Sequence, residues 1–78
     1  MKMTIDKLTN WVRKLAETKP YRISVKNGSG FYEIVFLYGE WHYSDRLSPK
    51  DLENELECQK LVLGMCQVFE RNIHLRVF

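Results

Sequence analysis

Apolar and polar residues alternate along most of residues 21–44, which is the pattern of β-strands that bury one face. Asn27-Gly28-Ser29-Gly30 has the composition of a four-residue hairpin loop, and Gly39-Glu40 has that of a two-residue turn. The two turns predict three antiparallel strands over residues 21–26, 31–38 and 41–44.

The turns also predict which residues of neighbouring strands lie opposite each other. The expected pairs are Val25 with Tyr32, Ile23 with Ile34, Tyr21 with Phe36, Tyr38 with Trp41 and Phe36 with Tyr43. This pairing gathers most large apolar side chains on one face, which we predict to be the core. Its members are Tyr21, Ile23, Val25, Tyr32, Ile34, Phe36, Tyr38, Trp41 and Tyr43.

The opposite face of the predicted sheet is mixed in character. It collects Arg22, Ser24, Lys26, Phe31, Glu33, Val35, Leu37, His42 and Ser44. Scattered apolar residues are ordinary on the surface of a monomer, whereas a contiguous apolar patch rimmed by charge is typical of a partner surface. We keep both interpretations and take six residues as candidate partner-binding positions: Phe31, Val35, Leu37, His42, Arg22 and Lys26.

Helical patterns flank the strands. Thr4 is a suitable N-cap for a helix that reaches about Thr18. Ser48, Pro49 and Asp51 form a capping-box signature for a second helix, which we expect to end near Asn72. Residues 73–78 alternate again and predict a fourth strand.

These elements predict a single domain over residues 1–78, of class α+β and order α-β-β-β-α-β. Both helices should cover one face of the antiparallel meander. The last strand should run beside the first at the sheet edge, in the spatial order 4-1-2-3.

The second helix is apolar over more than half of its circumference, so it needs more than one covering surface. A homodimer through residues 48–72, or through a sheet edge, would provide such a surface. Gly64 lies in the middle of this helix. It is either tolerated on the solvent-exposed side or marks a place where another group approaches the helix backbone closely.

Composition gives no strong indication of a partner class. The net charge is +2 with a pI of about 8.6, but residues 1–50 carry +4 and residues 51–78 carry −2. A nucleic-acid-binding module is therefore the alternative function. It would use Lys7, Arg13, Lys14, Arg22 and Lys26 together with Phe31.

No residues converge in the sequence as a catalytic or metal site. The acidic residues of segment 51–57 point to several sides of a helix, and His42 and His74 have no ligand at metal-binding spacing. Cys58 and Cys66 are separated by about 12 Å along one helix, too far for a disulfide. We expect reduced thiols, no cofactor, no metal and no enzymatic activity.

The order α-β-β-β-α over residues 4–72 resembles that of the double-stranded-RNA-binding domain. In that family a basic cluster at the start of the second helix contacts phosphates. The matching segment here is Ser48-Pro49-Lys50-Asp51-Leu52-Glu53-Asn54-Glu55, which is acidic. The resemblance therefore implies the order of elements, and like charge argues against RNA binding by that route.

The leading hypothesis is a small non-enzymatic adaptor, inhibitor or regulator that binds another protein through the mixed sheet face. Products of phages and mobile elements are often proteins of this kind, so such an origin is a secondary expectation. With no signal peptide, no membrane-spanning stretch and no disulfide pattern, we expect a cytoplasmic protein that does not enter a membrane.

Overall fold

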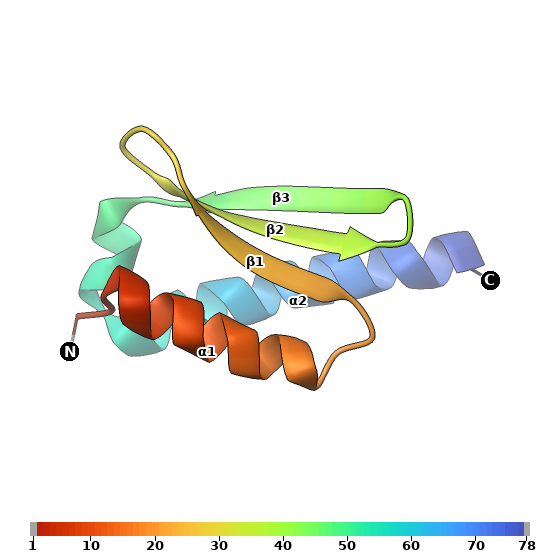
Figure 1. Ribbon diagram of the computed structural model, residues 1–78, viewed down its shortest axis with the longest axis horizontal. Coiled ribbons are helices and arrows are strands. Elements are labelled where there is room, and N and C mark those ends of the chain that lie inside the picture. Colours follow the sequence, from red (N-terminus) through yellow and green to blue (C-terminus); the bar gives the residue numbers. More distant parts are fainter. Residues whose placement is uncertain (1, 78) are drawn as a thin grey trace.

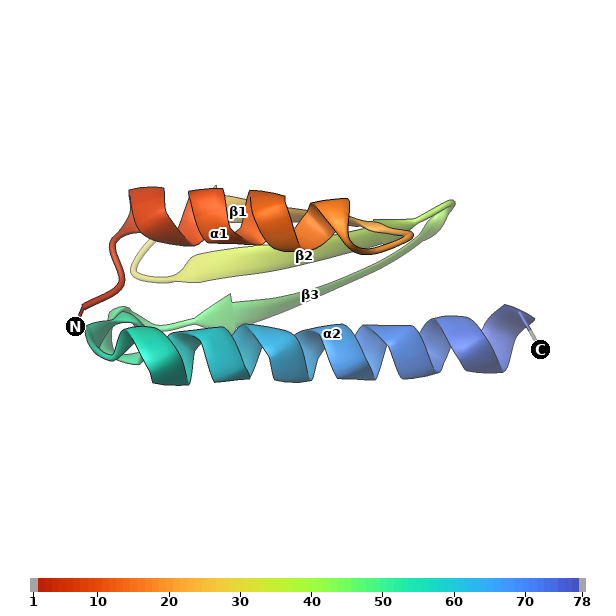
Figure 2. The same ribbon diagram turned by 90° about the horizontal axis from the view of Figure 1, so that it is seen from below.

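A computed structural model describes the backbone of residues 2–77 and the side chains of residues 2–73. The elements are α1 (Ile5–Glu17), β1 (Arg22–Asn27), β2 (Tyr32–Tyr38), β3 (Trp41–Leu47), the 3-10 helix η1 (Pro49–Glu53) and α2 (Glu55–Val77). The strands form one antiparallel sheet in the order β1-β2-β3, and both α-helices lie on the same side of it (Figures 1 and 2). The α+β class is confirmed.

Helix α1 begins and ends as its sequence predicts. The backbone N–H of Lys7 donates to Oγ1 of the N-cap residue Thr4 at 3.2 Å, which satisfies one of the unpaired donors at the start of a helix. Leu8 and Val12 are fully buried, one turn apart on the face toward β1. Thr18 closes the last turn two residues before Pro20.

The predicted register is right for one strand pair and wrong for the other. Phe36 lies opposite Tyr43, as expected. In the β1–β2 pair, however, Ile23 lies opposite Phe36 and Val25 opposite Ile34, a shift of two residues from the prediction. The reason is the loop, which comprises residues 28–31 and is closed by a 2.8 Å hydrogen bond from the Gly28 N–H to the Phe31 carbonyl.

A shift of two residues keeps every side chain on its predicted face, because side chains alternate with period two along a strand. Tyr21, Ile23, Ile34 and Phe36 are buried, so the assignment of their face to the core is confirmed. Strand β3 extends three residues beyond the predicted end at Ser44, to the buried Leu47.

The capping box predicted at Ser48 is present, but it begins a shorter element than expected. Ser48 and Asp51 bond reciprocally, and the turn they start is η1. Asn54 then has extended backbone angles, and its Oδ1 accepts a 3.0 Å hydrogen bond from the Glu57 N–H. Helix α2 therefore has its own cap and starts at Glu55, seven residues after Ser48.

The predicted fourth strand is wrong. Helix α2 continues through Asn72 to Val77, so the described sheet has three strands and the order 4-1-2-3 is not formed. Ile73 lies one helical turn after the buried Phe69 and packs against the core, so helical spacing extends past the expected end. A short alternating run is ambiguous between strand and helix, and tertiary packing decided it here.

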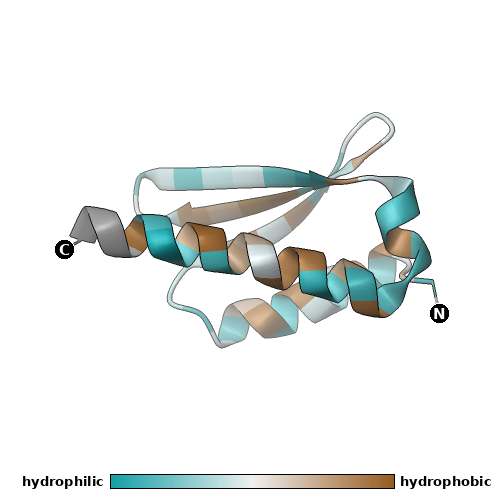
Figure 3. Cartoon of the chain, turned by 180° about the vertical axis from the view of Figure 1, so that it is seen from behind, coloured by the Kyte–Doolittle hydropathy of each residue, from teal (hydrophilic) through white to brown (hydrophobic). Residues whose placement is uncertain are grey.

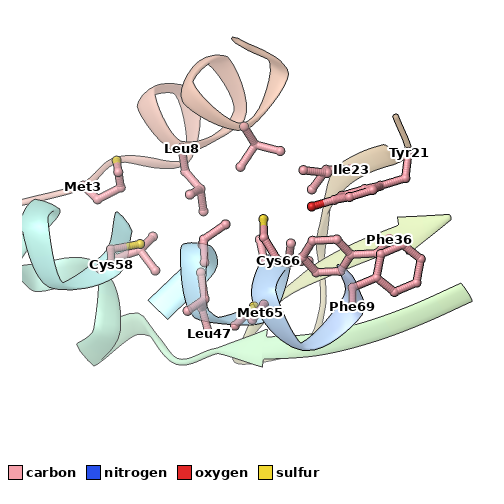
Figure 4. Close-up of a cluster of buried hydrophobic side chains, with 14 residues drawn as sticks. Met3, Leu8, Tyr21, Ile23, Phe36, Leu47, Cys58, Met65, Cys66 and Phe69 are labelled. Atoms are coloured by element: carbon pink, nitrogen blue, oxygen red, sulfur yellow. The ribbon is translucent and has the colours of Figure 1, made fainter. Parts of the chain in front are cut away.

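The core lies between the sheet and the two helices (Figure 4). Phe69 of α2 is its aromatic centre, with ring centroids 5.1 Å from Tyr21 and 5.4 Å from Phe36. Cys58 and Cys66 are buried, free thiols in the same core.

Helix α2 is only partly covered. Hydrophobic and hydrophilic segments both occur along its outer surface in Figure 3. Among its side chains up to residue 73, the exposed large apolar ones are Leu56, Leu61, Leu63 and Val68, of which Leu56 is the most exposed at 60%. A Cβ added at Gly64 would have no atom within 4 Å, so nothing in the described part of the molecule requires glycine there.

Within residues 2–77, no helix combines the length and the apolar character needed to span a bilayer.

Candidate partner-binding face

The face of the sheet opposite the helices is built from three rows of residues. Residues directly opposite each other in neighbouring strands point to the same side, so the register defines the rows. They are Arg22, Leu37 and His42; Ser24, Val35 and Ser44; and Lys26, Glu33 and Arg46. We call these nine residues the open face, because both helices lie on the other side of the sheet (Figure 2).

The first row brings together three of the six predicted partner-binding residues. Leu37 of the central strand is 38% exposed and is flanked by the exposed Arg22 and His42. Val35 follows it in the second row, about 7 Å away along the strand and between two serines. These residues form a small apolar centre with a charged side chain at its rim.

Phe31 does not join this centre. Its ring lies against Gly28, where an added Cβ would be 2.5 Å from the ring, and under the guanidinium of Arg46, 4.4 Å from the ring centroid. Glu33 separates it from Val35 along β2. Phe31 therefore stabilises the hairpin through a cation–π contact at the far end of the sheet.

Lys26 lies in the third row, opposite Glu33, while the predicted centre around Leu37 lies in the first. Arg46, in the same row as Lys26, was missed because the third strand was predicted to end at Ser44. Continuing the alternation from His42 and Ser44 by two residues would have placed Arg46 on this face.

The most perturbed titratable groups lie elsewhere, where the α1–β1 turn meets α2. The carboxylate of Glu70 accepts hydrogen bonds from Lys19 Nζ at 2.8 Å and from Tyr21 Oη at 2.5 Å. These bonds lower the pKa of Glu70, and the bond to Glu70 raises the pKa of Lys19. Burial, and then the bond to Glu70, raises the pKa of Tyr21.

This cluster joins two segments about fifty residues apart in the sequence, so no local pattern could have predicted it. Each group is used in holding the turn against α2, which makes the cluster structural. Burial raises the pKa of both Cys58 and Cys66, which disfavours the thiolate form.

No group of three or more His, Cys, Asp or Glu residues suited to a metal ion occurs among the described residues. His42 stands on the open face, and the side chain of His74 lies outside the described ones.

Comparison with known proteins gives no family assignment: no protein-family model, no curated protein and no solved structure matches the chain.

Proposed function

We propose that this protein is a small non-enzymatic binding module that acts on another protein, as a regulator, adaptor or inhibitor, through the open face. The observation that carries the proposal is the row of Arg22, Leu37 and His42, in which an exposed leucine lies between polar neighbours on a sheet face that neither helix covers. Apolar centres with charged rims are the usual composition of protein interfaces.

The proposal includes a reducing compartment such as the cytoplasm. Cys58 and Cys66 are both free and lie in the core, where oxidation would disrupt packing.

Affinity capture with matched variants tests the open face. The test variant is Val35→Ser/Leu37→Ser, and the control is Leu56→Ser/Leu63→Ser, which removes two exposed leucines from α2. Tagged proteins are incubated with lysate of the encoding organism, and the captured proteins are identified by mass spectrometry. We expect the wild type and the control to retain the same protein, and the test variant to lose it.

Three results would overturn the proposal. The first is equal capture by all three proteins, and the second is capture of nothing by the wild type. The third is loss of the partner only in the α2 control, which would instead assign binding to the helix surface and favour a homodimer or partner contact through residues 48–72.

Nucleic-acid binding is a second candidate, favoured by the grouping of Arg13, Arg22 and Lys26 along the β1 edge. The other two cations of the predicted nucleic-acid-binding set, Lys7 and Lys14, are exposed on α1 and do not line this edge. A gel shift at low salt with single- and double-stranded probes tests it. Retention that weakens steeply as salt rises is the expected signature of phosphate contacts.

A further inference from the structure

A groove follows the free edge of β1. Strand β1 is the first in the order β1-β2-β3, so among the described strands only β2 pairs with it. Beside the free edge lies a hollow of about 530 Å³ whose apolar lining is Ala16 and Ile23 on the helix side and Val35 and Leu37 on the open face. A second hollow of about 250 Å³ extends it between α1 and Val25. We call the two hollows together the β1 groove.

The walls of the β1 groove are positively charged. Arg13, Arg22 and Lys26 line the larger hollow, and Glu17 is its only acidic residue. Among the described side chains, the ion pairs within 4 Å are Lys19–Glu70 and Lys60–Glu57, so none of the three groove cations is paired in this way. The groove therefore presents unbalanced positive charge beside backbone groups that can accept another strand.

A second copy of the chain does not suit this edge. In an antiparallel pair of two β1 strands centred on Ser24, Arg22 of one copy would lie opposite Lys26 of the other. Like charges directly opposite each other destabilise a strand pair. The acidic segment of the chain itself, residues 51–57, is folded into η1 and the start of α2, so it is not free to occupy the groove.

We propose that the β1 groove binds an extended acidic segment of a partner protein, which adds to the sheet as a fourth strand beside β1. This inference rests on the proposed function and gives the partner's chemistry. Backbone hydrogen bonds to the edge provide affinity, and side chains at alternate positions provide specificity, as in other cases of strand addition.

The register of β1 defines the pattern of the added strand. Arg22, Ser24 and Lys26 point to the open face, so the partner residues on that side carry carboxylates. Residues at the alternate positions point toward Ala16 and Ile23, so small or β-branched apolar side chains fit there. About six residues, or roughly 20 Å of chain, pair with the length of β1.

Selection from a displayed library of random peptides, with the full chain as the target, tests this pattern. We expect enriched sequences in which Asp or Glu alternates with apolar residues and proline is absent. The best peptide is then synthesised, and its binding is measured by fluorescence anisotropy and by hydrogen exchange of the protein. Protection should appear at β1 amides.

Two charge-reversal variants supply the matched comparison. Arg22→Glu/Lys26→Glu should weaken binding of the selected peptide by about tenfold or more, because it replaces attraction with repulsion. Lys7→Glu/Lys14→Glu changes the net charge equally but lies outside the groove, and it should leave affinity within about twofold. Two further peptides are N-methylated at alternate residues, one at the odd and the other at the even positions, and both keep their carboxylates. The peptide whose methyl groups replace the N–H groups that face β1 should lose affinity, since strand addition needs those donors.

Several results would overturn the inference: selected peptides without acidic residues, equal binding to both variants, no protection of β1, or tighter binding of single-stranded DNA than of the peptide at the same salt. If these occur while capture still depends on Val35 and Leu37, strand addition is wrong and the proposed function stands. If both selection and capture fail, both proposals fall.

Discussion

At the scale of single residues, Gly64 lowers the stability of the fold, and no contact of the described residues requires a glycine there. It lies in the interior of α2, and an added Cβ would meet no atom within 4 Å. Glycine in a helix interior costs about 1 kcal/mol relative to alanine. We therefore expect Gly64→Ala to raise the free energy of unfolding in urea by about 1 kcal/mol. A decrease would show that the backbone there is needed by an interaction outside the described residues.

Gly28 is the opposite case. A Cβ at this position would lie 2.5 Å from the Phe31 ring, which would have to leave its place under Arg46. Gly28→Ala should lower the free energy of unfolding by about 1 to 2 kcal/mol.

A double-mutant cycle provides the control for Gly28. In a Phe31→Ala background the ring is gone, so the same substitution should cost clearly less. Equal costs in the two backgrounds would mean that the strain comes from the backbone of the loop and not from the ring.

At the scale of elements, Glu70 connects the α1–β1 turn to α2, and its contribution depends on pH. Its pKa in the folded protein is below the ordinary 4.5. Stabilisation from this group is therefore complete above the unfolded-state value and is lost as pH falls through the lower folded value. Lys19 stays charged throughout that range, because its pKa is raised from 10.5.

Glu70→Gln tests this dependence. The Glu70 side chain is 41% exposed, so solvent screening limits the expected loss at pH 7 to about 0.5 kcal/mol. Urea unfolding at pH 7 and at about pH 3 should show a difference between wild type and variant that shrinks in acid. A difference of the same size at both values would assign the effect to packing of Tyr21.

The types of the elements before residue 73 were predictable, whereas residues 73–77 were predicted as a strand and are helical. The ends and the pairing of the elements were less predictable than their types. Thr4 and the period of Leu8 and Val12 are local signals, and α1 was predicted almost to the residue. The capping box at Ser48 was also predicted from the sequence. Whether it starts a 3-10 helix or the long helix depends on Asn54, which supplies a second cap. The loop of the first hairpin was misplaced by one residue, because the ring of Phe31 packs on Gly28 and not in the strand.

At the scale of the whole molecule, positive charge at the β1 edge should keep copies of the chain apart. Wild type and Arg22→Glu/Lys26→Glu should each sediment near the monomer mass of 9.4 kDa. In a mixture of the two proteins, a wild-type β1 strand can pair with a variant β1 strand around Ser24. Arg22 and Lys26 of the wild type then lie opposite the acidic residues that the variant carries at positions 26 and 22. We expect heterodimers in the mixture at low salt and their loss at high salt.

Two outcomes would contradict this account of the edge. Dimers of the wild type alone that persist in Leu56→Ser/Leu63→Ser, where contacts through α2 are removed, would mean that the cations do not prevent pairing. A mixture that stays monomeric at low salt would mean that strand β1 is not available to another strand.

In the candidate site, as in the fold, the sequence predicted some features and missed others. Alternation along the strands placed Arg22, Val35, Leu37 and His42 on one face, and the structure has them there. Alternation did not reveal that Phe31 is held beneath Arg46, since that contact joins a loop to the end of another strand.

The sequence by itself determined the two sheet faces and the caps of α1 and η1, because each depends on periodicity or on groups a few residues apart. Only the tertiary structure decided that residues 73–77 continue a helix, that Glu70 meets Lys19 and Tyr21, and that Arg13 joins Arg22 and Lys26 beside a free strand edge. These features depend on which surfaces pack together, and a local pattern carries no information about neighbours that are distant in the chain.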